Sequence, residues 1–238
     1  LYQMQNFPAI SKPVTEALPM DIIERYIYTL KRNNNMYAVY SGDKSGDFFE
    51  VINMKSSPQL YKHFEAPEHT RWIFIKIRGV DKERVKTITY FDSSLAVMVN
   101  RSEPSSYMST DRPWYQQAIK TQTAVRSDPY LFSNLNQKGI TYSKRVEGTD
   151  TVLALDFTLP KLNALLKGLK FSDSSKIHMF GREGKIIASS EDATLRHDET
   201  INKIFSDSVK EKVFMLEKDG QMQFAMVTAL SSEDDSTT

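Results

Sequence analysis

The 238-residue chain contains no cysteine. This absence excludes disulfide bonds, thiolate catalysis and cysteine-ligated metal sites, and it is compatible with an oxidising compartment. Glycine is also scarce: its nine residues are spread along the chain and form neither a phosphate-binding loop nor a Gly-x-Ser-x-Gly motif. No apolar run approaches the ~18 residues that suggest a membrane-spanning helix, and the N-terminus does not read as a signal peptide.

Neither sign of charge is in excess. The 31 Lys and Arg residues balance 30 Asp and Glu residues, which leaves a formal charge of +1. The basic residues are scattered rather than arranged as a stripe with interleaved aromatics, so no nucleic-acid partner is expected. The four histidines have no metal-ligand spacing, and we predict neither a metal site nor a cofactor: His63, His69, His178 and His197.

What the chain does contain is apolar material for a core. Hydrophobic residues make up 40% of it and charged residues 26%, the balance of a soluble globular protein. Its length suits one large domain or two small ones. The chain starts at Leu1 rather than Met, so we expect a fragment of a longer protein. Prolines at 8, 13 and 19 prevent one continuous helix, so residues 1–20 are predicted to be a truncated or irregular segment.

Residue periodicity predicts an α+β fold. Apolar residues at helical spacing predict a helix over Met20–Arg32, which Asn33-Asn34-Asn35 should end. Trp114–Lys120 is predicted to form a short helix. Segments rich in β-branched and aromatic residues, separated by turn residues, predict strands: Met36–Ser41, Phe48–Met54, Arg71–Arg78, Val85–Phe91, Leu95–Asn100, Ile140–Val146 and Thr151–Phe157.

A second, smaller set of elements follows. Four leucines on one side predict a helix over Pro160–Leu169, with Thr158 as its N-cap. Residues 231–238 are acidic and rich in serine, and they are predicted to be a mobile tail. Between these segments the pattern predicts a further helix and two strand pairs: Lys176–Phe180 with Lys185–Ala188, Ile201–Lys210 as the helix, and Val213–Glu217 with Gln221–Leu230.

The strongest chemical feature is a group of polar side chains that together suit a zwitterion. Arg112 offers bidentate donors to a carboxylate, and Trp114 adds one N–H donor on an apolar ring. Asp156 follows the apolar run Thr151–Leu155, and a buried carboxylate there needs a cation or a proton. Tyr130 supplies a phenol that can accept from an ammonium group. The set predicts a binding site for a small molecule that carries both charges.

Less specific roles for these residues remain open. In one alternative, Arg112 forms an ion pair with Asp111 or Asp128 on the surface, and Trp114 is a core residue. In another, Asp156 helps to start the helix that follows it. Lys144 and Arg145 are predicted to form a solvated face. No nucleophile–base or carboxylate pair is visible, so we predict no catalytic residues and no enzyme activity in this fragment.

These residues give the chain a resemblance to double Cache sensor domains, the extracytoplasmic input modules of bacterial transmembrane signalling receptors. The resemblance covers roughly residues 20–230. It implies two stacked PAS-like modules, each an antiparallel sheet with flanking helices, joined by a connecting helix. The membrane-distal, ligand-binding module would span residues 21–160 and the membrane-proximal module residues 161–230. Four segments carry the resemblance: residues 107–115, 127–130, 139–141 and 155–159.

Amino-acid-binding members of that family share a pattern of six pocket residues, and all six positions are filled here: Tyr107, Arg112, Trp114, Tyr115, Tyr130 and Asp156. By resemblance, Arg112 and Trp114 bind the ligand carboxylate, whereas Tyr130 and Asp156 bind its amine. The family also implies partners, namely transmembrane helices and a cytoplasmic kinase, cyclase or phosphodiesterase, with this domain outside the inner membrane. The alternative is a ligand-free interaction module that mediates homodimerisation or contact with a periplasmic binding protein, for which an occluded distal pocket is expected.

Overall fold

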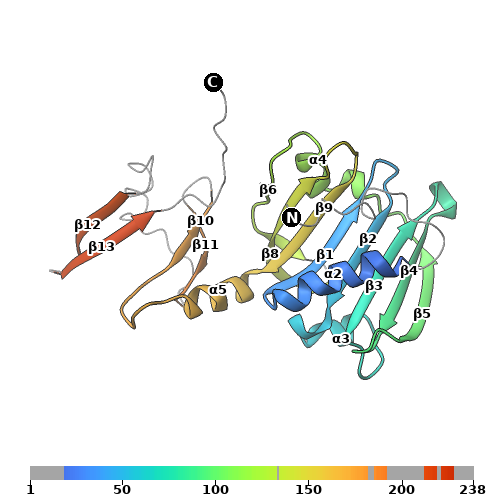
Figure 1. Ribbon diagram of the computed structural model, residues 1–238, viewed down its shortest axis with the longest axis horizontal. Coiled ribbons are helices and arrows are strands. Elements are labelled where there is room, and N and C mark those ends of the chain that lie inside the picture. Colours follow the sequence, from blue (N-terminus) through green and yellow to red (C-terminus); the bar gives the residue numbers. More distant parts are fainter. Residues whose placement is uncertain (1–18, 133, 182–184, 192–211, 219–220, 228–238) are drawn as a thin grey trace.

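The computed structural model describes residues 19–132, 134–181, 185–191, 212–218 and 221–227. Its main body is one nine-stranded antiparallel sheet with few helices (Figure 1). The strand order is β5-β4-β3-β2-β1-β9-β8-β6, and β7 also pairs with β8. The fold is therefore α+β, as the sequence predicts.

The sheet is built from β1 (Met36–Gly42), β2 (Phe48–Asn53), β3 (Trp72–Arg78), β4 (Val85–Phe91), β5 (Val97–Pro104), β6 (Val125–Arg126), β7 (Tyr130–Phe132), β8 (Gln137–Arg145) and β9 (Val152–Thr158). The helices are α2 (Met20–Arg32), α3 (Gln59–His63), α4 (Pro113–Ala118) and α5 (Leu159–Gly168), with single 3-10 turns η1 (Met54–Ser56), η2 (Asp81–Glu83) and η3 (Ser109–Asp111). None of the helices in the described part of the chain has the length and apolar character needed to span a membrane.

Most predicted elements are confirmed with small shifts at their ends. The helix Met20–Arg32 and the strand Val85–Phe91 have the predicted bounds. The next strand begins later than predicted because Asp92 forms a tight turn, with its carboxylate accepting from the backbone N–H groups of Ser94 and Ala96. Leu95 adopts a left-handed φ of 68° within that turn, so it cannot belong to the strand. The sequence pattern did not predict α3, β6 and β7.

The two faces of the sheet bury two separate cores. Alternate residues of each strand point to opposite faces, so Leu153 and Leu155 of β9 pack beneath α2 while Ala154 and Asp156 face the other way. Figure 1 shows α2 lying across one face of the sheet. Its buried side is apolar throughout: Ile22, Ile23, Tyr26, Ile27 and Leu30. The opposite face carries the larger core and leaves room for a cavity.

A bulge in β1 changes which side chains reach that second core. The pairing of β1 with β9 shifts between Met36 and Ala38, which leaves Tyr37 as the extra residue. A bulge of this kind re-aims side chains at a sheet. Tyr37 and Ala38 consequently both pack in the core opposite α2, whereas Met36 packs in the core beneath it.

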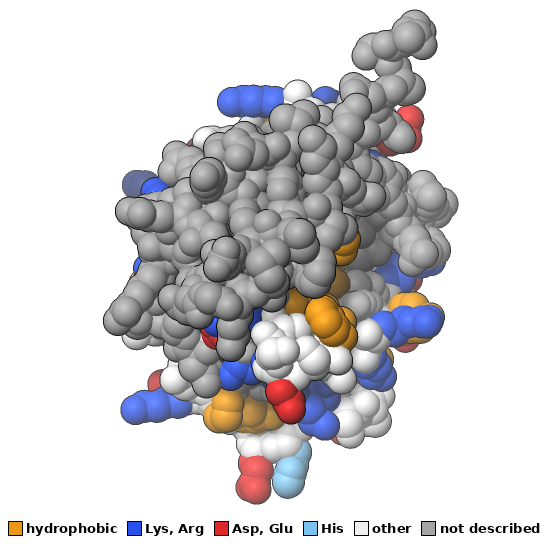
Figure 2. Space-filling model, turned by 90° about the vertical axis from the view of Figure 1, so that its left-hand side faces the viewer, with side chains coloured by type: hydrophobic (Ala, Val, Ile, Leu, Met, Phe, Trp, Pro, Cys, Tyr) orange, Lys and Arg blue, Asp and Glu red, His pale blue; other side chains and the backbone are white. Residues whose placement is uncertain are grey.

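The remaining elements lie beyond α5 and form two short antiparallel pairs: β10 (His178–Phe180) with β11 (Ile186–Ser189), and β12 (Lys212–Lys218) with β13 (Gln221–Val227). Leu162 of α5 packs with Ile140 of β8 and Ile187 of β11, which ties the first pair to the sheet. Seen from this end, the described acidic and basic side chains are interspersed (Figure 2). Both predicted strand pairs are confirmed, while the predicted helix Ile201–Lys210 lies outside the described residues, as do residues 1–18 and 231–238.

Candidate functional site

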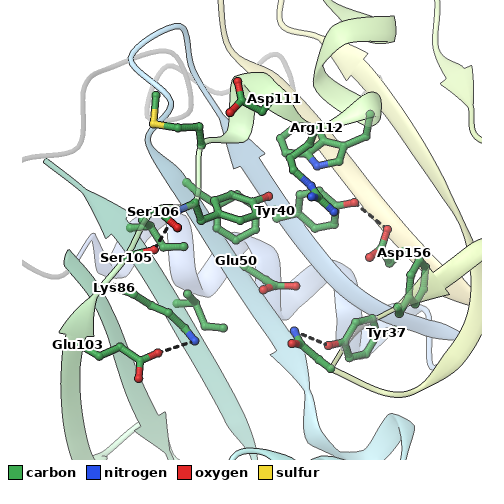
Figure 3. Close-up of a pocket in the computed structure, with 18 of the residues that line it drawn as sticks. Tyr37, Tyr40, Glu50, Lys86, Glu103, Ser105, Ser106, Asp111, Arg112 and Asp156 are labelled. Carbon is green, nitrogen blue, oxygen red and sulfur yellow. Dashed lines mark hydrogen bonds and ion pairs between the residues drawn. The ribbon is translucent and has the colours of Figure 1, made fainter. Parts of the chain in front are cut away.

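A cavity of ≈ 660 Å³ opens on the sheet face opposite α2, within the size range of small-molecule sites (Figure 3). Its floor is formed by β1, β2 and β9, and one wall by the segment from β5 to α4. The lining includes five of the six residues predicted from the sequence: Tyr107, Arg112, Trp114, Tyr130 and Asp156. The structure therefore brings these five together around one space.

A buried arginine fixes the wall that carries Tyr107. The side chain of Arg84 is 3% exposed; its Nε donates to the Tyr107 carbonyl at 2.7 Å, and its other nitrogens donate to the carbonyls of Gly79 and Gly46. Asp47 lies 3.6 Å from the guanidinium and supplies counter-charge. Because one planar group holds three backbone segments, the wall has little freedom to move away from the sheet.

The wall also needs a glycine beneath it. A Cβ atom on Gly42 would lie 2.5 Å from Ser109 Cβ and 2.9 Å from the Trp114 ring, which is closer than side chains pack. Ser109 in turn donates from Oγ to the Asp47 carbonyl at 3.0 Å. This close approach seats the start of α4 directly on β1.

The next residues place the indole of Trp114 against the floor. Pro113 occupies the first turn of α4, where its missing N–H costs no hydrogen bond. Ser143 of β8 donates to the Trp114 carbonyl at 3.0 Å, and the indole meets the Tyr40 ring edge-on at 5.0 Å. Trp114 is 5% exposed. It therefore belongs to the core and lines the cavity at the same time.

Arg112 lies at the mouth of the cavity and is exposed. Its guanidinium carbon is 5.7 Å from the centre of the Tyr107 ring. Among the described residues no ion pair joins Arg112 to Asp111 or Asp128, so surface pairing does not occupy it. Its charge reaches the cavity, because it opposes the burial-driven rise in the pKa of Tyr107 and of Tyr130.

Asp156 is the centre of a hydroxyl network on the floor. Its Oδ1 accepts from Tyr40 at 2.7 Å and from Thr141 Oγ1 at 2.6 Å. The Tyr130 hydroxyl lies 2.6 Å from the same Thr141 oxygen and is the donor there, since the Thr141 proton points to Asp156. These contacts exclude a role for Asp156 in capping α5. Thr158 holds the N-cap position of that helix without a side-chain hydrogen bond.

The surroundings of Asp156 leave it without a cation. It is 6% exposed, and its Oδ2 makes no hydrogen bond within the described part of the chain. Burial raises its pKa to about 7, even though the hydroxyls of Thr141 and Tyr40 favour the charged form. A cationic group at Oδ2 would remove the cost of holding this charge away from water.

Sequence reasoning missed a second carboxyl on the same floor. Glu50 of β2 lies opposite Tyr40 of β1, lines the cavity and is 6% exposed. Burial raises its pKa to about 8; Asp156 adds to the rise and Lys86 opposes it. The pattern that drew attention to Asp156, an acid inside an apolar strand, also occurs at Phe48-Phe49-Glu50-Val51.

Two other predicted features lie elsewhere. Tyr115 does not line the cavity: its ring packs edge-on against Trp114 at 5.8 Å, and its hydroxyl donates to the Asp150 carbonyl at 2.7 Å. The prediction of a solvated face at Lys144 is wrong: this residue is 7% exposed and lies opposite Leu153 of β9, on the sheet face that carries the core beneath α2. Its neighbour Arg145 is half-buried and pairs with Asp150 at 2.9 Å.

The arrangement combines a cationic mouth with an acidic floor. Arg112 presents donors at one side, while Asp156 and Glu50 present buried carboxyls among tyrosine hydroxyls. No group of three or more potential metal ligands occurs within the described ranges. The site can hold a molecule with a carboxylate at one end and an amino group at the other.

Comparison with solved structures gives the class of fold, that of chemoreceptor sensory domains. The sensory domain of the Campylobacter jejuni chemoreceptor Tlp3 (CcmL) is similar with a TM-score of 0.56 and 16% identity, over 96% of this chain and 76% of that one. The Tlp3 ligand-binding domain in complex with L-valine gives a TM-score of 0.51 and 17% identity, over 94% and 73% of the two chains.

The Tlp3 sensory domain with isoleucine bound gives a TM-score of 0.50 and 18% identity, over 96% of this chain and 75% of that one. At these identities the likeness establishes the fold. The resemblance to a sensor domain is thereby confirmed at the level of fold. No protein-family model and no curated protein sequence matches the chain.

Proposed function

We propose that this chain is the ligand-binding sensor domain of a bacterial transmembrane signalling protein, and that it binds a small amine-bearing carboxylate, most simply an amino acid. One observation carries the proposal: the same cavity has Arg112 at its mouth and, on its floor, the buried Asp156 without a cationic partner among the described residues. The solved Tlp3 domains of the same fold, in complex with L-valine and with isoleucine, support this reading.

In the proposed complex, the ligand carboxylate is bound by Arg112 and the indole N–H of Trp114. The ammonium group takes Asp156 Oδ2, with the Tyr130 hydroxyl as an additional acceptor. An ammonium group binds Asp156 only when this carboxyl is ionised. Because burial raises its pKa to about 7, part of the ligand-free protein carries a protonated Asp156 at neutral pH, and the ligand ammonium stabilises the ionised form. Tyr107 closes the wall over the ligand, and no catalytic step is assigned to the site.

The remaining organisation follows from this proposal. Residues 21–160 form the membrane-distal module and residues 161–230 the membrane-proximal module, with α5 as the connecting helix. The distal strands have two arrangements against α5, and the ligand favours the one that it binds more tightly. The size of this shift is set by the difference between its affinities for the two arrangements. The proximal module passes the change to a membrane helix and a cytoplasmic output domain. The domain itself lies in the periplasm or outside the cell.

The alternative, a ligand-free dimerisation module, is less well supported because it expects an occluded cavity. A cavity of ≈ 660 Å³ with two buried carboxyls is costly to maintain without a ligand. If the alternative holds, dimerisation of the purified domain will be insensitive to every metabolite tested.

A thermal-shift screen of amino acids and amines on the purified chain tests the proposal. A ligand present at 100 times its dissociation constant should add ~2.7 kcal/mol to the free energy of unfolding. Asp156→Ala is the matched control, since it should abolish the shift while the variant remains folded. The proposal fails if no zwitterion and no amine stabilises the wild-type chain.

A further inference from the structure

Glu50 has no partner within the described residues, although it is almost fully buried. No hydrogen bond or ion pair of its carboxyl is formed there, and its side chain faces the cavity (Figure 3). The charge of Lys86 acts on Glu50, but the Lys86 Nζ is held 2.9 Å from Glu103 Oε1. Arg112 lies across the cavity from Lys86 and Glu103. Glu50 is therefore a buried acid that awaits a counter-charge from outside the chain.

Strand pairing separates Glu50 from Asp156. Glu50 lies opposite Tyr40, and Asp156 lies opposite Ala38, two residues earlier on β1. Across three adjacent strands this diagonal corresponds to roughly 12 Å between the two Cα atoms. Figure 3 shows the two carboxyls at different points of the floor, both facing the cavity. An ammonium group held by Asp156 therefore leaves Glu50 without a cation.

We infer that the ligand carries a second amino group, which binds Glu50. The ligand class is then a diamino carboxylic acid: its carboxylate binds Arg112, its α-ammonium binds Asp156, and the ammonium at the end of its side chain binds Glu50. The inference rests on the proposed function and assigns Glu50 as the residue that determines specificity. A ligand with a neutral side chain would place no compensating charge beside the Glu50 carboxyl.

Lysine and norleucine form the matched pair of probes, because they differ chiefly in the terminal amino group. Isothermal titration of the whole chain should show lysine binding about tenfold to a hundredfold more tightly, the worth of one charge-assisted hydrogen bond. Glu50→Gln keeps the shape of the side chain and removes its charge. In that variant the preference for lysine over norleucine should be lost.

The outcomes separate this inference from the proposed function. Equal affinity for lysine and norleucine in the wild type, or a preference for lysine that survives Glu50→Gln, overturns the role of Glu50 while amino-acid binding stands. If neither compound nor any other zwitterion binds, the proposed function itself fails. Cadaverine, which has two amino groups and no carboxylate, should bind more weakly than lysine; equal affinity would replace the ligand class with a diamine.

Proton release gives a second measurement on the wild-type chain. The charged or titratable groups facing Glu50 are Asp156 of β9, Lys86 of β4, Tyr37 of β1 and Tyr107 of the wall. Glu50 is largely protonated at neutral pH, so an ammonium that binds it must displace that proton. Titrations at pH 7 in buffers of different ionisation enthalpy should show more protons released by lysine than by norleucine. Equal release for the two compounds overturns the assignment.

Discussion

The two faces of the nine-stranded sheet are made from alternate residues of the same strands, yet they bury different chemistry. Beneath α2 the packing is apolar, with Trp72, Phe74 and Leu155 as typical members. On the opposite face, Asp156 and Glu50 are as deeply buried as that core. An apolar core maximises stability, whereas buried acids without cations lower it, so the second face is built to receive a ligand.

The largest effect should come from the apolar face. Trp72 is fully buried, and Trp72→Ala should lower the free energy of unfolding by about 3–5 kcal/mol through lost burial and a new cavity. Chemical denaturation measures the loss. Where the variant is still folded, its ligand affinity should match the wild type, and a selective loss of affinity would contradict the separation of the two faces.

Asp156→Asn should produce the opposite pattern. We expect ligand affinity to fall by about a hundredfold or more, because the ligand ammonium would be buried without a counter-charge. The free energy of unfolding should stay the same or rise at neutral pH, since a costly buried acid has been replaced by a neutral amide. Titration calorimetry and denaturation on one preparation test both parts. A strongly destabilised variant with intact affinity would make Asp156 a structural residue.

The buried acids also predict how the stability of the ligand-free chain depends on pH. The pKa of Asp156 is raised to about 7 and that of Glu50 to about 8, above their unfolded values near 4. Folding therefore favours the protonated acids, and stability is lost as the pH rises from about 4 through 8. The loss should be on the order of 6 kcal/mol between pH 5 and pH 9. Chemical denaturation at several pH values measures this loss. In the doubly substituted chain, Asp156→Asn with Glu50→Gln, the free energy of unfolding should change less over that range.

Ligand affinity should change with pH in the opposite direction. An ammonium group binds the ionised acids, so affinity should rise between pH 6 and pH 8, until the ligand amine itself loses its proton. A constant affinity over this range would mean that neither acid contacts the ligand cation.

A smaller effect is expected at the mouth of the cavity. Arg112→Met should weaken ligand binding by about tenfold, because this exposed cation competes with water for the carboxylate. Arg112→Lys should restore part of the affinity, since it keeps the charge and loses the bidentate geometry. Added salt should weaken wild-type binding more than binding by Arg112→Met. An equal salt dependence in both proteins would remove Arg112 from the site.

The smallest effect should follow Tyr115→Phe. The Tyr115 hydroxyl bonds to the Asp150 carbonyl and lies away from the cavity lining. Its removal should cost about 1 kcal/mol of stability and leave ligand affinity within a factor of two. A large loss of affinity with unchanged stability would return Tyr115 to the binding site.

The sequence predicts most of the fold because its elements are locally encoded. The five apolar positions of α2 and the alternating strands carry their own periodicity, so their positions follow without knowledge of neighbours. The three-residue strand β7 depends on its pairing with β8, and periodicity does not reveal it. Lys144 shows the same limit, because its burial depends on the pairing of β8 with β9, which places it beside Leu153.

The candidate site is predictable in part for the same reason. Arg112, Trp114 and Asp156 stand out by residue type in their local context. Tyr40 and Glu50 become part of the site only through the pairing of β1 with β2 and β9. This pairing brings residues that are distant in sequence onto the same cavity floor. Tyr115 follows Trp114 in the motif, but its hydroxyl bonds to the Asp150 carbonyl and it does not line the cavity, an outcome that the motif alone does not fix.

The most direct test of the central claim is a crystal structure of this chain grown with its tightest-binding amino acid. We expect density for one ligand in the cavity, with its ammonium group about 3 Å from Asp156 Oδ2 and its carboxylate at Arg112. An empty cavity, or a ligand with its carboxylate turned toward Asp156, would contradict the claim.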